Sequence, residues 1–194
     1  MLAIAKVEYE DKRFPINVED FSKPEFDEAK ATGAFATNMD RAPTFTIDGV
    51  TFGQSKTIDR FIARKYGFMG ATDIEGAQID MLTEHCRDVR QKYADVRAGK
   101  KDDDLAAAKT AFVGTDLATW AAKIEKCVVG TDGFTVGDKL SLADITLYLL
   151  VKDHFDDKEG AAAAFACAPN TLAAVAKVEE AAAEWIAARP DTKF

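Results

Sequence analysis

The sequence lacks several features that mark specialised classes of protein. It has no excess of positive charge, because 33 acidic residues outnumber 25 basic ones and leave a net charge of −8. This balance argues against a surface for nucleic acid or for an anionic membrane. No apolar run approaches the roughly 20 residues that span a bilayer. The opening MLAIA is too short for a signal-peptide core and has no basic leader.

Cysteine and histidine are also scarce. The three cysteines, Cys86, Cys127 and Cys167, are widely spaced and form no C-x-x-C pair. We therefore expect reduced thiols in or near helical cores. The two histidines, His85 and His154, have no partner at metal-ligand spacing, so we expect no metal site. The 194 residues, 47% of them hydrophobic, are enough for one good core or two small ones.

The first third of the chain mixes strand and helix signals. Residues 7–16, VEYEDKRFPI, alternate in polarity and then meet a proline, which predicts a short strand leading into a loop. Residues 24–31, PEFDEAKA, predict a short helix that begins at Pro24, where the missing N–H of proline costs nothing.

A β-hairpin and a helix are predicted next. Residues 44–47 and 50–52 are β-rich and flank Asp48-Gly49, a strong two-residue hairpin signal. From Lys56 the apolar spacing becomes helical, and Gly67 ends that helix. The pair Gln54-Ser55 lies between the predicted second strand and the predicted helix. Its residue types suit a helix cap as well as a ligand site.

The chain after a linker at 68–72 is predicted to be helical. Residues 161–168, AAAAFACA, are alanine-rich and favour helix. We expect a small α/β domain at residues 1–67 and an all-helical domain at residues 73–194. The helical prediction rests on apolar stripes at helical spacing, which comprise Ile74, Ala77, Met81, Leu82, Cys86, Val89, Tyr93 and Val96, then Val113, Leu117, Trp120, Ile124 and Val128, then Leu172, Val175, Val178, Ala182 and Ile186 before Arg189-Pro190.

The sharpest local signal is GDKLSLADITLY at residues 137–148. Ser141 and Asp144 have the spacing of a capping box, in which each side chain accepts a hydrogen bond from the other residue's backbone N–H. Such a box contributes on the order of 1 kcal/mol to a helix. We assign it a structural role.

Five blocks, VEYED, APTFTIDG, GQSKTIDRFIARKYG, KIEKCVVGTDGFTVGDKLSLADITLY and EWIAARPDTKF, resemble in order those of the cytosolic glutathione transferases. The chain is most similar to the sigma-type branch of that family. The resemblance covers nearly the whole chain and implies a thioredoxin-like N-terminal domain followed by an all-helical domain. It also implies a homodimer located in the cytoplasm, with an organelle lumen as the alternative.

The resemblance also assigns roles at the corner near Pro43. It implies a cis peptide bond before Pro43 and pairing of the Ala42 backbone with the cysteinyl part of glutathione. Gln54 and Ser55 would hold the γ-glutamyl end, at a helix N-terminus that suits a carboxylate.

Three further residues match family positions. Lys30 would meet the glycyl carboxylate, and Phe26 stands where the family often has tryptophan; a packed phenylalanine and a solvated lysine are the alternative interpretation. Asp88 matches an acidic residue that meets glutathione across the dimer interface. It belongs to a stripe with Asp80 and Glu84, which either is solvated or meets a cation.

The sequence departs from the family at its front. Family members begin with a strand and a helix before the block LAIAKVEYED, and that strand carries the tyrosine or serine that stabilises the thiolate of glutathione. We therefore assign no catalytic residue, and Tyr9 is interpreted as packing. The sheet would lack a middle strand, which a partner chain could cover.

Three functions remain open at this point. The first is a glutathione transferase that conjugates or isomerises small apolar electrophiles, provided that its N-terminus is complete in the mature protein. The second is a non-catalytic, transferase-like structural or binding subunit of a larger assembly. The third is a carrier of an apolar ligand between the two domains.

Overall fold

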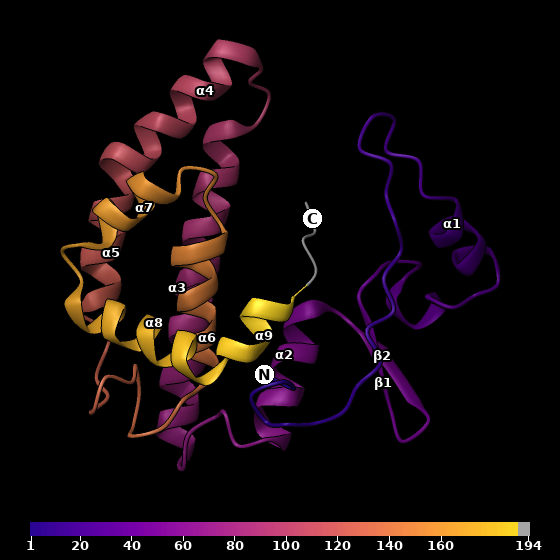
Figure 1. Cartoon of the computed structure of the whole chain (residues 1–194), viewed down its shortest axis with the longest axis horizontal. Coiled ribbons are helices and arrows are strands. Elements are labelled where there is room, and N and C mark those ends of the chain that lie inside the picture. The colour runs from indigo at the N-terminus through magenta and orange to yellow at the C-terminus, as the bar shows by residue number, and fades with distance from the viewer. Residues whose placement is uncertain (190–194) are drawn as a thin grey trace.

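The computed structural model of the protein describes residues 1–189. Figure 1 shows a hairpin and a short helix at one end of the long axis, a bundle of helices at the other, and α2 between them. The first part contains α1 (Pro24–Ala31), a 3-10 turn (Ala36–Asn38), β1 (Thr44–Ile47), β2 (Val50–Gly53) and α2 (Ser55–Lys65). The bundle contains α3 (Asp73–Arg97), α4 (Asp102–Ala111), α5 (Leu117–Glu125), α6 (Leu142–Tyr148), α7 (Lys158–Phe165), α8 (Pro169–Ala181) and α9 (Ala183–Ala188). Two π-helical turns, Phe112–Asp116 and Leu149–Asp153, precede α5 and follow α6.

The predicted hairpin is confirmed. Strands β1 and β2 pair antiparallel with Phe45 opposite Phe52. Asp48 and Gly49 between them have φ angles of 51° and 76°, the left-handed pair that a two-residue hairpin requires. Within residues 1–189 the sheet has these two strands.

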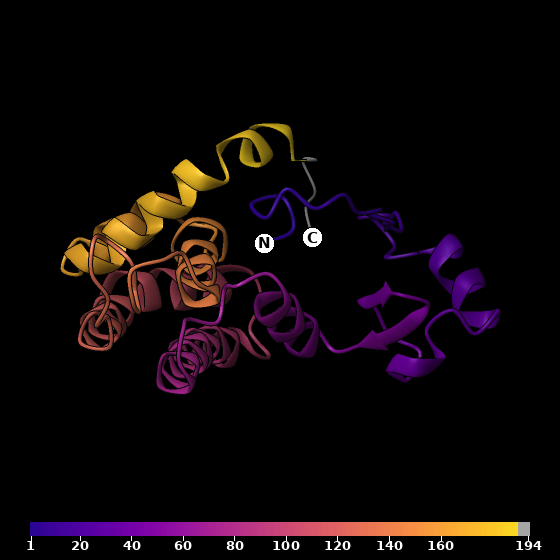
Figure 2. The same cartoon turned by 90° about the horizontal axis from the view of Figure 1, so that it is seen from below.

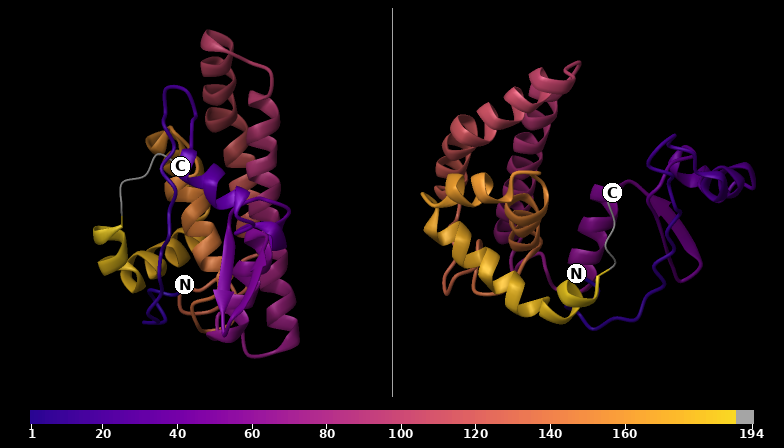
Figure 3. Two further views of the ribbon diagram at one scale, coloured as in Figure 1. Left: turned by 90° about the vertical axis from the view of Figure 1, so that its right-hand side faces the viewer. Right: turned by 45° about the horizontal axis from the view of Figure 1, so that its top comes forward.

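The strand predicted at residues 7–16 is wrong. This segment contains no regular structure, and Tyr9 and Ile16 are 45% and 39% exposed. A strand needs a neighbouring edge to satisfy its N–H and C=O groups, and β1 pairs with β2 alone. Figure 3 shows the segment running from the neighbourhood of α9 across to the hairpin and α1. Alternating polarity alone is therefore not enough to make residues 7–16 a strand.

Helix α2 joins the hairpin to the bundle. It ends as predicted, with Gly67 at a φ of 80°. Ala63 near its end and Phe68 in the following linker belong to the hydrophobic core of the bundle. The Phe68 carbonyl accepts a hydrogen bond of 2.9 Å from the N–H of Leu142 at the start of α6.

The bundle buries most of the predicted apolar stripes, but Ile74, Ala77 and Met81 at the start of the first stripe are exposed. Figure 2 shows α6 between α8 on one side and α3 on the other, and α6 packs against both. One stripe is interrupted, because helix geometry breaks at Ala182, with φ −109° and ψ 10°, between α8 and α9. Pro190, which was expected to close the stripe, lies outside the described residues. No helix within residues 1–189 combines the length and the apolar character that crossing a bilayer would need.

The capping box is confirmed and is larger than predicted. The Asp144 Oδ2 accepts from the Ser141 N–H at 2.7 Å, and the Ser141 Oγ accepts from the Asp144 N–H at 3.5 Å. The Asp144 Oδ1 also accepts from the N–H of Thr135 at 2.8 Å. Burial raises the pKa of Asp144, against the effect of these hydrogen bonds. The box thus ties the loop before α6 to the helix itself.

The cysteines are free thiols, as predicted. Cys86 is fully buried on α3, and burial raises the pKa of its thiol to about 12. A thiol in this state is inert as a nucleophile at neutral pH.

Candidate functional site

The corner between the 3-10 turn and α2 has the geometry that the sequence predicts. The Ala42–Pro43 peptide bond is cis. Gln54 precedes α2 with a φ of 71° and makes no side-chain hydrogen bond to cap it, and Ser55 is the first helical residue. Both side chains are exposed. Because the N–H groups at the start of α2 have no side-chain cap, they are open to an external acceptor.

Asn38 connects the two halves of this corner. Its Nδ2 donates to the carbonyls of Arg41 and Pro43 at 2.7 and 2.9 Å, and its Oδ1 accepts from the N–H of Gln54 at 3.1 Å. Asn38 is only 5% exposed. One side chain therefore fixes the backbone on both sides of Ala42 relative to Gln54.

The sequence did not identify Asn38, since it lies in a short stretch, GAFATNMDR, without helical or strand periodicity. The sequence did contain one indication of this contact, which is Gly53, the residue directly before Gln54. A Cβ at Gly53 would lie 2.1 Å from the Asn38 Cγ, so the contact requires a residue without a side chain. An isolated glycine at the end of a strand often marks such a close approach.

A large groove lies beside the corner. It has a volume of about 2020 Å³ and is lined by Ala42, Pro43, Phe26, Phe45 and Tyr9 among others. The structure thus brings three of the predicted site residues, Phe26, Ala42 and Pro43, to one groove. Lys30, Gln54, Ser55 and Asp88 are not part of its lining.

Phe26 and Lys30 have different environments on α1. Phe26 is half-buried and stacks on Phe35, with ring centroids 4.8 Å apart, while Phe14 packs edge-on against Phe26 at 5.7 Å. Lys30 is exposed. The aromatic cluster holds α1 against the loop that leads to Pro43.

The acidic stripe on α3 meets a cation within the same chain. The Arg60 guanidinium of α2 donates to Asp80 at 2.7 Å and also to Glu84. Arg87 forms a second ion pair with Glu84 at 2.8 Å. The Arg60 hydrogen bond is the main cause of the lowered pKa of Glu84. Asp88 has no part in this network and is exposed on α3.

Tyr9 does not pack as predicted. Its side chain is 45% exposed, and its hydroxyl accepts a hydrogen bond of 3.2 Å from the indole N–H of Trp185 on α9. The interpretation as packing was wrong because the segment forms no strand and so has no sheet face to bury.

Residues 87–189 match the family model described as glutathione S-transferase, C-terminal domain. The chain is 34% identical over 152 residues to glutathione S-transferase 4 of Caenorhabditis elegans, which covers 76% of this chain and 68% of that protein. It is 30% identical over 151 residues to glutathione S-transferase 3 of the same organism, covering 74% and 67%.

Solved structures agree with the sequence comparisons. Na-GST-3, a glutathione S-transferase of the hookworm Necator americanus that is described as monomeric, superposes with a TM-score of 0.76. The two share 26% identity, over 100% of this chain and 90% of that one. The Pi-class glutathione S-transferase of Onchocerca volvulus has a TM-score of 0.75 at 23% identity, over 97% and 84%, and so supports the fold. The chain has this fold, a thioredoxin-like part followed by a helical part.

Proposed function

Because the chain belongs to the glutathione S-transferase family, we propose that it binds glutathione at the corner of Ala42, Pro43, Gln54 and Ser55. We propose further that it conjugates or isomerises small apolar electrophiles with the bound thiol. The observation that carries the proposal is the Asn38 clamp, which joins the Pro43 carbonyl to the Gln54 N–H beside an uncapped helix start. This arrangement presents backbone and side-chain groups together to a peptide-like ligand.

Each part of glutathione has a proposed partner. Within residues 1–189 the backbone N–H and C=O of Ala42 make no hydrogen bond, so they can pair with the cysteinyl part as an added strand. Gln54 and Ser55 would bind the γ-glutamyl carboxylate, which the start of α2 favours electrostatically. Lys30 would bind the glycyl carboxylate, and Phe26 would shape the groove.

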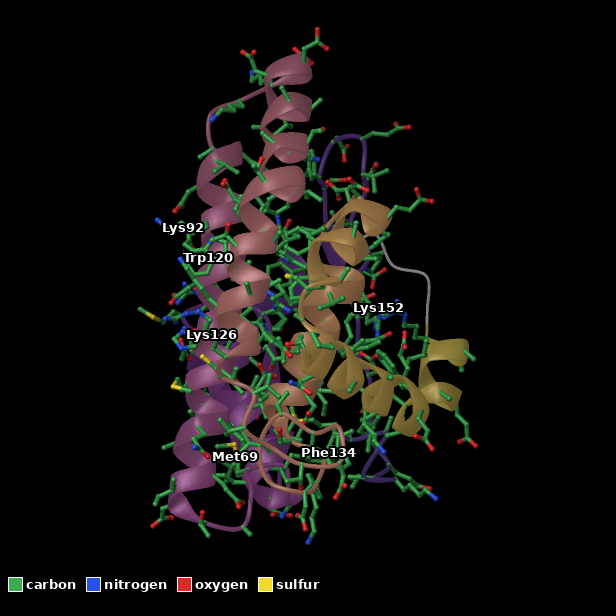
Figure 4. All side chains as sticks on the ribbon, turned by 90° about the vertical axis from the view of Figure 1, so that its left-hand side faces the viewer. Met69, Lys92, Trp120, Lys126, Phe134 and Lys152 are labelled. Atoms are coloured by element: carbon green, nitrogen blue, oxygen red, sulfur yellow. The ribbon has the colours of Figure 1, made fainter. Side chains whose placement is uncertain are left out.

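A homodimer is the proposed assembly, and α3 carries the argument for it. Ile74 and Met81 on this helix are 72% and 41% exposed. Asp88 follows Met81 at the same spacing of seven residues, which keeps all three on one face. Figure 4 shows Lys92, four residues further on, pointing away from the helical core. Pairing through this face would bury the apolar residues and bring Asp88 to the γ-glutamyl ammonium in the partner.

The finer assignments are also proposals. Residues 1–67 would form the glutathione-binding domain and residues 73–194 the helical domain, in a sigma-like member that acts in the cytoplasm. A partner chain would cover the free edge of β1, which faces the groove.

A non-catalytic binding or structural subunit is the second candidate function. Of the four hydroxyl groups that line the groove, those of Tyr9 and Thr46 already form hydrogen bonds, to Trp185 and to Thr51 at 2.8 Å, and those of Thr44 and Tyr66 are assigned no role. No described residue is assigned to activate the thiol.

Two measurements on one set of proteins test the proposal and separate its alternatives. Calorimetry with glutathione would use the wild type, the double variant Gln54→Ala, Ser55→Ala, and Gly114→Ala as a control, because no atom lies within 4 Å of the Cβ added at Gly114. Since hydrogen bonds to charged groups contribute about 1.5–3 kcal/mol each, the double variant should bind at least tenfold more weakly. Equal affinities in all three would contradict the site.

Turnover then separates the two functions. The first function predicts conjugation of an aryl halide faster than the uncatalysed reaction, and the second function predicts glutathione binding without such turnover. Rapid turnover would establish the first function and show that another residue ionises the thiol.

A further inference from the structure

Two buried side-chain nitrogen atoms in residues 1–189 have no hydrogen-bond partner. They are the Nε of Arg90 on α3 and the Nε2 of His154, which follows the π-helical turn after α6. Buried polar groups in folded proteins are almost always paired, so each such atom needs an explanation. Arg90 lies three residues before Tyr93 on α3, and the Tyr93 ring contacts the His154 ring with centroids 5.8 Å apart.

The charges around His154 are mostly positive. The pKa of His154 is lowered to about 4, chiefly by burial and then by the charges of Arg90, Arg97 and Lys158. In the part of the chain that the structure describes, none of these three cations forms an ion pair within 4.0 Å. Asp156 acts in the opposite direction on His154, but its carboxylate is bound to the Lys109 Nζ at 2.6 Å.

Aromatic rings hold the site in place. The His154 ring packs edge-on against Tyr93 and Phe155, with centroids 5.8 and 5.0 Å away. The Arg97 guanidinium lies over the Tyr93 ring, 4.3 Å from its centroid, and its Nε donates to the Tyr93 carbonyl at 3.2 Å. Tyr93 and Phe155 are each 1% exposed, so the imidazole and this guanidinium rest on a rigid wall.

The position along α3 explains why these cations lack partners. Asp80 and Glu84 near the start of the helix are compensated by Arg60 of α2. Arg90 lies three residues after Arg87 on α3, and Arg97 lies seven residues after Arg90, two turns further along the helix. Figure 1 shows that α3 extends well past α2 toward α4. Helix α2, whose Arg60 neutralises Asp80 and Glu84, therefore does not extend along the part of α3 that carries Arg90 and Arg97.

We propose that Arg90, Arg97 and His154 form a binding site for a small carboxylate or a related oxyanion. A guanidinium can bind both oxygens of a carboxylate through parallel N–H donors, and it is hydrated more weakly than an ammonium group. The His154 Nε2–H would donate to the same anion. Binding would supply partners for both orphan nitrogens and would offset the positive charge around the imidazole.

Nuclear magnetic resonance of the intact protein tests this site without depending on glutathione. Benzoate is the probe, benzamide is its neutral match, and inorganic phosphate tests for a general oxyanion site. The chain has two histidines, so His85 serves as an internal reference for His154. We expect benzoate to shift the His154 imidazole signals saturably and benzamide to leave them unchanged. Phosphate that competes would broaden the ligand class to oxyanions, and phosphate without effect would restrict it to carboxylates.

Variants on α3 complete the test. Arg90→Gln should weaken benzoate binding about tenfold or more, and Arg87→Gln, three residues earlier in an exposed ion pair, should bind as the wild type does. Because Arg90 has no partner to lose, Arg90→Gln should keep or raise the Tm. Equal shifts with benzoate and benzamide, unchanged affinity in Arg90→Gln, or a fall in its Tm of more than about 5 °C would each overturn the proposal. Arg97→Gln gives an independent measurement of the same affinity, expected to fall in the same way.

Discussion

Asp144 is the residue whose removal should most clearly weaken the helical part. It is fully buried at the start of α6, where its carboxylate accepts from the N–H groups of Ser141 and Thr135 and from the Ser141 hydroxyl at 2.6 Å. Replacement by alanine would leave two buried N–H groups unpaired, at a cost of about 1–3 kcal/mol each. The N–H group of Ser141 is the one that the capping box pairs, so the box adds no separate cost. We therefore expect Asp144→Ala to lower the free energy of unfolding by about 4 kcal/mol.

Urea denaturation followed by circular dichroism would measure this loss. Asp144→Asn keeps one acceptor oxygen and should lose about half as much, roughly 2 kcal/mol. Asp138→Ala is the control, because Asp138 is exposed in the same loop. A loss below about 1 kcal/mol for Asp144→Ala would refute the reasoning, since it would mean that the burial cost of the carboxylate cancels its hydrogen bonds.

Three further predictions concern other parts of the molecule. The pKa of His154 is lowered from 6.5 to about 4 in the folded protein, so the unfolded chain binds the proton more readily. The stability that the neutral imidazole contributes is therefore present above pH 6.5 and is lost as the pH falls toward 4. Denaturation at pH 7 and pH 4 should show the wild type losing about 2 kcal/mol more than His154→Phe, after allowance for partial solvent screening; equal losses would contradict this. Arg60→Met should destabilise by about 1 kcal/mol at low salt, and a double-mutant cycle with Glu84→Gln that gives no coupling would count against the ion pair between α2 and α3. Gly53→Ala should displace Asn38, whose Cγ would lie 2.1 Å from the new Cβ, and should weaken glutathione binding about tenfold; Gly114→Ala, where no atom lies within 4 Å of the added Cβ, should bind as the wild type does in the same calorimetric titration.

Local signals in the sequence predicted local structure well. The Asp48-Gly49 turn, the proline that opens α1 and the box of Ser141 and Asp144 each specify their geometry within four residues. The bond from Asp144 to Thr135 nine residues earlier was not predicted, which is why the expected cost of losing the box rises from about 1 to about 4 kcal/mol.

Contacts between distant residues could not be predicted in the same way. Asn38 contacts Gln54 sixteen residues away, and Arg60 reaches Glu84 at a separation of 24. Nothing in the spacing of either residue identifies its partner. The segment 7–16 shows the reverse case, because its pattern suits a strand but pairing depends on an edge that the local sequence does not contain.

The central claim is that glutathione binds at the corner that Asn38 holds together, and chemical-shift mapping of the intact protein tests it most directly. Glutathione added to ¹⁵N-labelled protein should shift the amide signals of Ala42, Gln54 and Ser55 saturably and leave those of α4 unchanged. Asn38→Ala should reduce these shifts at equal glutathione concentration. Shifts confined to other residues, or none at millimolar glutathione, would contradict the account.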